Sequence, residues 1–175
     1  MASYKVVVTG PFNSGKTEFI KTISDIPVVS TEKRITTEDR GIKAETTVAM
    51  DYGRVAIDGD TLYLYGTPGQ ARFDFMWEIL SSEMNGFIVL VDSTDLPSFP
   101  DAAELIDLFS SLVNVPYLVV ANKTDLEGAA KLAEVRRGTK AGADVTVMPC
   151  VATQKSSVRQ VLLQMIELLK KENAR

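Results

Sequence analysis

The sequence contains no histidine at all. Histidine is the usual general base of triad hydrolases and a usual zinc ligand, so Ser-His-Asp chemistry and histidine-based zinc sites are excluded. The single cysteine, Cys150, excludes an internal disulfide and fits a reducing compartment. Any chemistry in this protein must therefore use carboxylates, amides, hydroxyls, lysine or arginine.

The chain also lacks long apolar runs and an excess of basic charge. No run reaches the roughly 18–20 residues that span a bilayer, the first residues show no signal-peptide pattern, and no lipidation motif is present. A net charge of −4 argues against a nucleic-acid partner held by bulk electrostatics. With 175 residues, 45% of them apolar, we expect one cytoplasmic domain with a substantial core and without a membrane anchor.

Short apolar runs alternate with helical patterns along the chain. Continuous runs of Val, Ile and Leu suit parallel strands that are covered by helices on both faces. Four such runs predict strands at 4–10, 86–92, 115–123 and 144–150. Helices are predicted at 16–24, 71–84, 101–113, 128–140 and 156–171.

Two further strands, 47–57 and 61–65, flank the turn Asp58-Gly59-Asp60. Glycine tolerates a positive φ in a tight turn, so we predict a hairpin in which Ile57 lies opposite Thr61. The element order predicts a three-layer α/β fold with a mostly parallel six-stranded sheet, one antiparallel strand and about five helices. The connection 25–46 is expected to be irregular.

The stretch "GPFNSGKT", residues 10–17, fits the phosphate-loop pattern G-x-x-x-x-G-K-[ST]. It follows a predicted strand and opens a predicted helix, so backbone N–H groups and the helix dipole would favour phosphate. Lys16 would reach the terminal phosphates and the Thr17 hydroxyl would bind Mg²⁺. The nucleotide-binding residues predicted at this loop are Gly10, Asn13, Ser14, Gly15, Lys16, Thr17 and Glu18.

The stretch "NKTD", residues 122–125, directly follows another predicted parallel strand. The carboxylate of Asp125 can accept hydrogen bonds from N1–H and N2–H₂ of guanine, whereas adenine offers no such pair of donors. Lys123 would lay its aliphatic stem along the base, and Asn122 would tie this loop to the phosphate loop. The two motifs together predict a site for GTP and GDP and disfavour an ATP-dependent kinase.

Over nearly its whole length the chain resembles the Ras-like small GTPases, which implies a single P-loop G domain over residues 1–175. The segment "GTPGQARFDFMWEIL" resembles switch II, with similarity to the Arf branch and to bacterial gliding-motility and conservon-type GTPases. The resemblance implies that Gly69 donates its N–H to the γ-phosphate and that Gln70 orients the attacking water. It also implies that "CVATQ" offers the Ala152 N–H to the guanine carbonyl, with Thr153 beside it and a slip of one residue left open.

The metal site departs from the family pattern because Gly66 stands where a switch II aspartate is usual. The resemblance implies that Thr47, with Thr46 as its competitor, completes the Mg²⁺ shell. Our hairpin register puts position 52 opposite Gly66 and Asp51 one step away. We therefore hypothesise that Asp51 replaces the missing carboxylate, the alternative being a solvated aspartate and weak metal binding.

These residues predict a molecular switch that hydrolyses GTP slowly with Mg²⁺, with Lys16 and Gln70 as catalytic residues. Phe12 occupies a position where many relatives keep glycine, and it either crowds an incoming arginine or packs against the switches. Segment 25–46 is either a surface insertion or an element that refolds with nucleotide. The resemblance implies a roadblock/longin-type protein as partner or activator. The alternative function is a pseudo-GTPase scaffold with negligible turnover.

Overall fold

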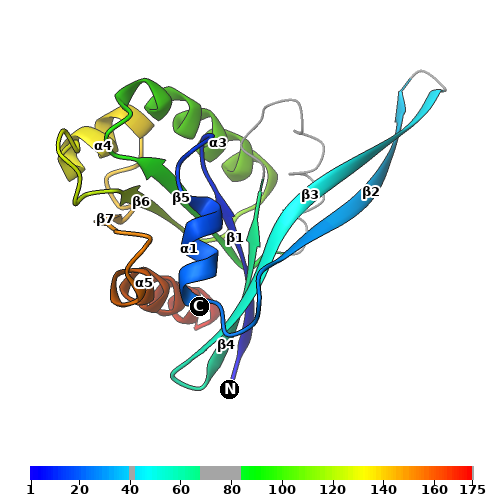
Figure 1. Ribbon diagram of the computed structural model, residues 1–175, viewed down its shortest axis with the longest axis horizontal. Helices are drawn as coiled ribbons and strands as arrows, with labels where there is room; N and C mark the ends of the chain where they lie inside the picture. The colour runs from blue at the N-terminus through cyan, green and yellow to red at the C-terminus, as the bar shows by residue number, and fades with distance from the viewer. Residues whose placement is uncertain (40–41, 68–83, 175) are drawn as a thin grey trace.

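The computed structural model describes residues 1–39, 42–67 and 84–174 (Figure 1). Within these residues the strands are β1 Ser3–Thr9, β2 Val29–Asp39, β3 Ile42–Ile57, β4 Asp60–Gly66, β5 Gly86–Asp92, β6 Tyr117–Asn122 and β7 Val147–Pro149. They form one seven-stranded sheet in the order β2-β3-β4-β1-β5-β6-β7. Among the described strands only β3 runs against the others, so the predicted mostly parallel α/β sheet is confirmed.

Helices cover both faces of this sheet. They are α1 Lys16–Ile23, α3 Phe99–Leu112, α4 Leu132–Thr139 and α5 Lys155–Asn173, with a short 3-10 helix η2 at Leu96–Ser98. Helices α1 and α5 pack against each other on one face, and α3 and α4 pack against each other on the other (Figure 1). The predicted helix at 71–84 lies outside the described residues, apart from its last position. No helix in the described ranges is long and apolar enough to cross a bilayer.

Two apolar cores hold the layers together, and alternation along the strands assigns each side chain to one of them. In β4, Leu62 and Leu64 are fully buried and belong to the core beneath α1 and α5. On the other face, the rings of Phe87 and Phe109 stack at 5.0 Å between centroids in the core beneath α3. Both cores combine continuous apolar runs that the sequence analysis assigned to buried strands with the apolar faces of the helices.

The sheet has one strand more than predicted, because residues 29–39 form β2 instead of an irregular connection. We predicted strands from apolar runs, and this polar segment contains none, so we expected it to be irregular. It is nevertheless rich in Val, Ile and Thr, which favour extended backbone. Residues 42–50 of β3 pair with β2 alone, whereas residues 51–57 pair with β4. The outer part of the β2–β3 ribbon consequently projects away from the helices (Figure 1).

The turn between β3 and β4 sets the register of this hairpin. Asp58 and Gly59 both have positive φ, 50° and 88°, as a two-residue hairpin turn requires. Ile57 therefore lies opposite Asp60, and the predicted pairing of Ile57 with Thr61 is wrong by one residue. The correction moves every cross-strand pair of the hairpin by one position.

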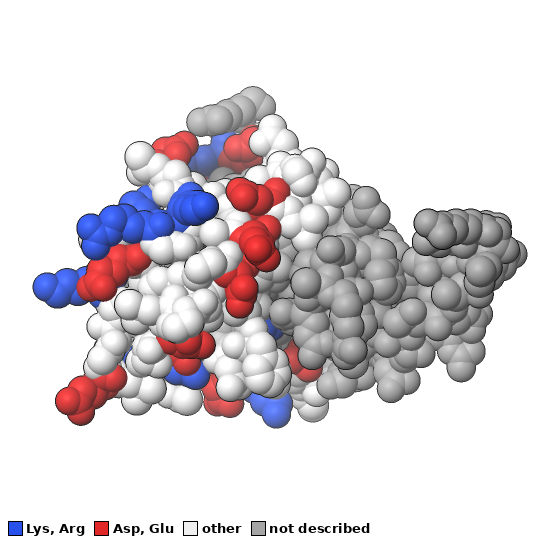
Figure 2. Space-filling view, turned by 90° about the horizontal axis from the view of Figure 1, so that it is seen from above, with Lys and Arg blue, Asp and Glu red and all other residues white. Residues whose placement is uncertain are grey.

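Both acidic and basic side chains lie on the described part of the surface seen in Figure 2. One acidic side chain serves the packing of the chain ends. Asp60 is buried, accepts a hydrogen bond from the Ala2 N–H at 3.0 Å, and lies 2.9 Å from the Lys170 ammonium of α5. This carboxylate joins the start of β1, the hairpin and the last helix.

We predict that Asp60→Asn lowers the free energy of unfolding at pH 7. Hydrogen bonds from Lys170 and Ala2 lower the pKa of the Asp60 carboxyl in the folded protein. The stabilisation is therefore complete above the unfolded pKa of about 3.9 and is lost as the pH falls through the lower folded value. Denaturant unfolding at a series of pH values should show the variant approaching wild type below about pH 4.

Asp58→Asn is the matched control, because Asp58 is an exposed carboxylate of the same turn that pairs with the exposed Arg159. It should change stability little at any pH. A deficit in Asp60→Asn that stayed constant down to pH 3 would contradict the assignment.

Candidate functional site

The phosphate loop joins β1 to α1 and needs glycine at two positions. Gly10 and Gly15 have φ of 154° and 100°, which side chains rarely tolerate. A Cβ at Gly10 would lie 2.1 Å from the Leu90 carbonyl oxygen, and one at Gly15 would lie 2.3 Å from Asn122 Nδ2. The loop is thereby packed tightly against β5 and β6, and its N–H groups lead into the first turn of α1.

Lys16 folds back over this loop. Its ammonium donates to the carbonyl oxygens of Gly10 and Pro11, at 2.8 and 2.9 Å, and to Ser14 Oγ at 3.4 Å. Burial lowers its pKa to about 8, although the negative charge of Asp51 opposes that shift. The cation is thus held where it would meet an anion in the loop.

Asp51 lies directly opposite Gly66 in the β3–β4 pairing, so the predicted offset of one residue is corrected. A Cβ built on Gly66 would lie 3.3 Å from Asp51 Cβ and 3.7 Å from Asp51 Oδ2. The Thr17 hydroxyl donates to the same Oδ2 at 2.5 Å. The carboxylate of Asp51 therefore occupies the space beside the missing switch II side chain.

The oxygens of Thr17 and Asp51 are of the hard type that Mg²⁺ prefers, so this donor set fits the ion. The described residues contain no group of three acidic, cysteine or histidine side chains that could hold a metal. A cation between Thr17 and Asp51 would consequently take most of its remaining ligands from phosphate oxygens and water.

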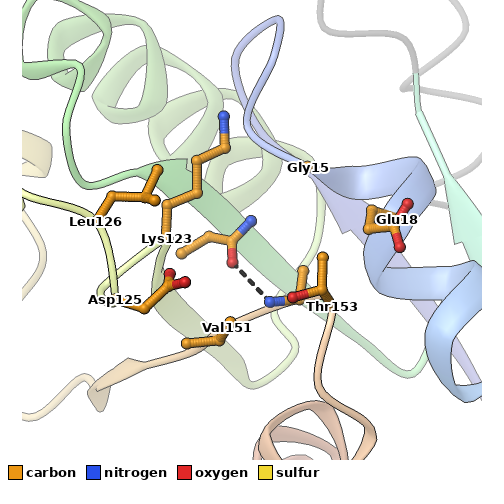
Figure 3. A pocket seen from close by; sticks show the side chains of 9 residues that line it. Gly15, Glu18, Lys123, Asp125, Leu126, Val151 and Thr153 are labelled. Carbon is orange, nitrogen blue, oxygen red and sulfur yellow. Dashed lines mark hydrogen bonds between the residues drawn. The ribbon is translucent and has the colours of Figure 1, made fainter.

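The base-side loop follows β6, and its first residue connects three segments. The buried amide of Asn122 donates from Nδ2 to the Ser14 carbonyl oxygen at 2.9 Å. Its Oδ1 accepts the Ala152 N–H, also at 2.9 Å, as the dashed line in Figure 3 shows. Asn122 thus ties its own loop to the phosphate loop, as the sequence predicted. It also ties both of them to a second base-side loop, the one after β7 that carries Ala152.

A pocket of about 240 Å³ opens between these loops. Figure 3 shows the Asp125 carboxylate, Val151 and Thr153 on one side of it and Gly15 and Glu18 toward α1. Its lining residues are Gly15, Glu18, Asn122, Lys123, Asp125, Leu126, Val151, Ala152 and Thr153. The pocket is therefore bounded by an ionisable acceptor, apolar side chains and the start of the phosphate-loop helix.

One hydrogen-bond donor that the sequence predicted for the base already has an acceptor within the protein. The Ala152 N–H, expected to reach a guanine carbonyl, donates to Asn122 within the protein. The Thr153 N–H, one residue further along, has no acceptor among the described residues. The slip of one residue that the sequence left open thus points to Thr153 as the donor available at this pocket.

The structure brings together the residues predicted at the phosphate loop with Asn122, Lys123, Asp125 and Thr153. Thr47 lies in β3, paired with Arg34 of β2. Gly69 and Gln70 lie outside the described residues.

Sequence reasoning missed Asp92, the last residue of β5, whose carboxylate lies 2.8 Å from the Lys123 ammonium. The available signal was an aspartate that ends a buried apolar run beside another strand end.

Comparisons with known proteins agree with a nucleotide site. A family model described as "Conserved hypothetical ATP binding protein" matches residues 8–172. Uncharacterized protein MJ1339 of Methanocaldococcus jannaschii is 35% identical over 122 residues, which cover 70% of this chain and 71% of that protein. The family model thus spans the phosphate loop, the loop after β6 and the loop after β7.

Two Arf-related proteins are also similar. ADP-ribosylation factor-related protein 1 of Homo sapiens is 27% identical over 176 residues, covering 94% of this chain and 84% of that protein. ADP-ribosylation factor-like protein 8d of Arabidopsis thaliana is 29% identical over 125 residues, covering 70% and 64%. These similarities support the resemblance to the Ras-like superfamily and its Arf branch.

We predict that Asn122→Ala uncouples the loops and destabilises the nucleotide-free protein. Truncation leaves the buried Ser14 carbonyl and Ala152 N–H without their partner, at about 1–3 kcal/mol for each group that water cannot reach. Thermal and denaturant unfolding would measure the loss. The exposed Asn114→Ala is the control, with an expected change within about 0.5 kcal/mol; equal stability of the two variants would contradict the connecting role of Asn122.

Proposed function

The chain belongs to the family of conserved hypothetical ATP-binding proteins, and we propose that it is a guanine-nucleotide-binding molecular switch with a single G domain. The observation that carries this proposal is the pocket in which the Asp125 carboxylate faces the start of the phosphate-loop helix. Similarity to ADP-ribosylation factor-related proteins supports the same class.

We propose guanine as the base, although the family description names ATP. The carboxylate of Asp125 offers two acceptor oxygens, which match N1–H and N2–H₂ of guanine. Adenine has no pair of donors on that edge, so the carboxylate would lose water without gaining partners. The Thr153 N–H is suited to the guanine carbonyl, and the Lys123 stem to the plane of the ring.

At the phosphate end of the site, the phosphate loop and Lys16 would bind the phosphates. Phosphate oxygens in the loop would accept hydrogen bonds from its N–H groups and from the first turn of α1. The Lys16 ammonium, now held by carbonyl oxygens, would exchange them for the more strongly accepting terminal phosphates. Mg²⁺ would be held by Thr17 and Asp51 and would neutralise charge that develops on the phosphates. Thr47 lies in the part of β3 that pairs with β2 alone, so it would join the metal only after the ribbon rearranges when the γ-phosphate is present.

We further propose that Gln70 orients the attacking water, that Gly69 donates to the γ-phosphate, and that hydrolysis by the lone protein is slow. The Phe12 side chain is 73% exposed at the phosphate loop, where it would meet an arriving partner group. An arginine supplied in trans contributes about 10³–10⁵-fold in this chemistry. Three further points remain predictions from the sequence: a roadblock/longin-type activator, a cytoplasmic location, and membership of this chain in the gliding-motility branch.

We predict that the wild-type protein binds GDP at least about 100-fold more tightly than ADP, because ADP leaves the Asp125 carboxylate unpaired. Asp125→Asn should lose that preference and gain affinity for xanthosine diphosphate. Asparagine offers one acceptor and one donor, which match the N1–H and the 2-carbonyl of xanthine. Competition against a fluorescent nucleotide measures all three affinities.

The exposed Asp101→Asn on α3 is the matched control and should bind GDP as wild type does. Equal wild-type affinities for GDP and ADP would overturn the guanine assignment and make ATP, which the family description names, an equal candidate.

We predict that Asp51→Ala raises the Mg²⁺ concentration needed for half-maximal GTP retention by about tenfold, because it removes one charged ligand. Single-turnover conversion of bound GTP, followed over a range of Mg²⁺ concentrations, measures both retention and hydrolysis. Wild type should hydrolyse slowly, and a roadblock/longin-type protein should raise that rate.

Asp58→Asn removes a negative charge from the same hairpin and keeps a residue that tolerates the positive φ of its turn, so it should leave the Mg²⁺ dependence unchanged. An unchanged dependence in Asp51→Ala would show that Asp51 is no metal ligand. Intact GTP after many hours, with and without the activator, would favour the pseudo-GTPase scaffold, which the missing carboxylate at Gly66 also supports.

A further inference from the structure

A carboxylate outside the predicted motifs touches the base-side loop. Asp92 ends β5 and pairs with Asn122 across to β6, so it lies beside the first residue of the "NKTD" stretch. Its side chain is 13% exposed. Oδ1 accepts hydrogen bonds from the Thr94 N–H at 2.9 Å and from the Thr94 hydroxyl at 2.6 Å. Oδ2 accepts one from the Lys123 ammonium at 2.8 Å.

These contacts keep Asp92 ionised. Burial by itself raises the pKa of the Asp92 carboxyl, but hydrogen bonds from Lys123 and Thr94 outweigh burial and hold the pKa below its ordinary value. The carboxylate is thus a fixed negative charge at neutral pH, with both oxygens occupied and its position set by Thr94.

Lys123 connects this charge to the phosphate loop. Besides Asp92, its ammonium donates to the Asn13 carbonyl oxygen at 3.1 Å. In Figure 3 the Lys123 side chain runs past the pocket, and its ammonium points away from Asp125 toward the loop that precedes Gly15. The stem of Lys123 is therefore held at both ends, by the backbone after β6 and by two acceptors at its tip.

We propose that Asp92 is a positioning residue for nucleotide binding, which anchors the Lys123 ammonium against the phosphate loop and so keeps the lysine stem in place along the base. The inference rests on the proposed nucleotide site and adds to it a residue that contacts neither base nor phosphate.

The physical reason lies in the freedom of a lysine side chain. A solvated lysine has many rotamers, and ordering it when ligand arrives opposes binding. An ammonium already held by a charged acceptor leaves less to be ordered, and hydrogen bonds that involve an ionised partner are the stronger kind. Loss of the anchor should therefore appear chiefly as faster release of nucleotide, since the stem no longer covers the base continuously.

The test is a double-mutant cycle on the dissociation rate of fluorescently labelled GDP, with wild type, Asp92→Asn, Lys123→Met and the double variant. Asparagine keeps the size of the side chain but removes its charge. We expect about tenfold faster release from Asp92→Asn and at least as large an increase from Lys123→Met. The double variant should release GDP within about twofold of Lys123→Met alone, because Asp92 acts through Lys123.

The exposed Asp95→Asn, three residues further along, is the matched control and should release GDP at the wild-type rate. Thr94→Val provides a second variant if Asp92→Asn folds poorly. It removes one support of the carboxylate and should accelerate release by about two- to threefold in the wild-type background only.

The outcomes separate this inference from the proposed function. A wild type that binds no guanine nucleotide would overturn both. A wild type that binds GDP, combined with wild-type release from both Asp92→Asn and Thr94→Val, would overturn the positioning role alone. So would an acceleration by Asp92→Asn that is equally large in the Lys123→Met background, because that pattern indicates general damage to the fold.

Discussion

The buried amide of Asn122 is the interaction on which the geometry of the site depends. It joins the Ser14 carbonyl of the phosphate loop to the Ala152 N–H of the last base-side loop, and Gly15 leaves just enough room for it. The phosphate loop, 108 residues before Asn122, and the loop of Ala152, 30 residues after it, are thereby held in one arrangement. A buried amide without these partners would be costly, so the loops and Asn122 specify one another.

A second constraint acts beside the phosphate loop, at Gly66, where the Ras-like pattern has an aspartate. Gly66 is buried, and a Cβ built on it would lie 2.9 Å from Ile20 Cδ1 and 3.3 Å from Asp51 Cβ, so these two side chains fill the space that a larger residue would need. The two-residue turn at Asp58-Gly59 brings Asp51 directly opposite that position and within hydrogen-bond distance of Thr17. A carboxylate beside the phosphate-loop hydroxyl is therefore retained, although it comes from the neighbouring strand.

The base end of the site combines a rigid frame with few polar groups. Asn122 belongs to the frame, and the ion pair between Lys123 and Asp92 extends that frame to β5. What remains to meet a ligand is the Asp125 carboxylate, the Thr153 N–H and apolar surface. Most polar groups are thus satisfied within the protein, and a few are left for the ligand. A wrong ligand would leave those few without partners, and the free-energy cost of that loss makes such a pocket selective.

The sequence by itself determined the α/β class, most strand positions, the phosphate loop and the loop that carries Asn122 and Asp125. These features depend on neighbouring residues: an apolar run, glycines at a tight turn, a lysine and threonine at the start of a helix. Only the tertiary structure decided that 29–39 is a strand, that Asp51 rather than its neighbour faces Gly66, that the Ala152 N–H is occupied, and that Asp92 holds Lys123. Strand register and pairing between distant loops follow from turn geometry and packing across the sheet, which local patterns do not encode.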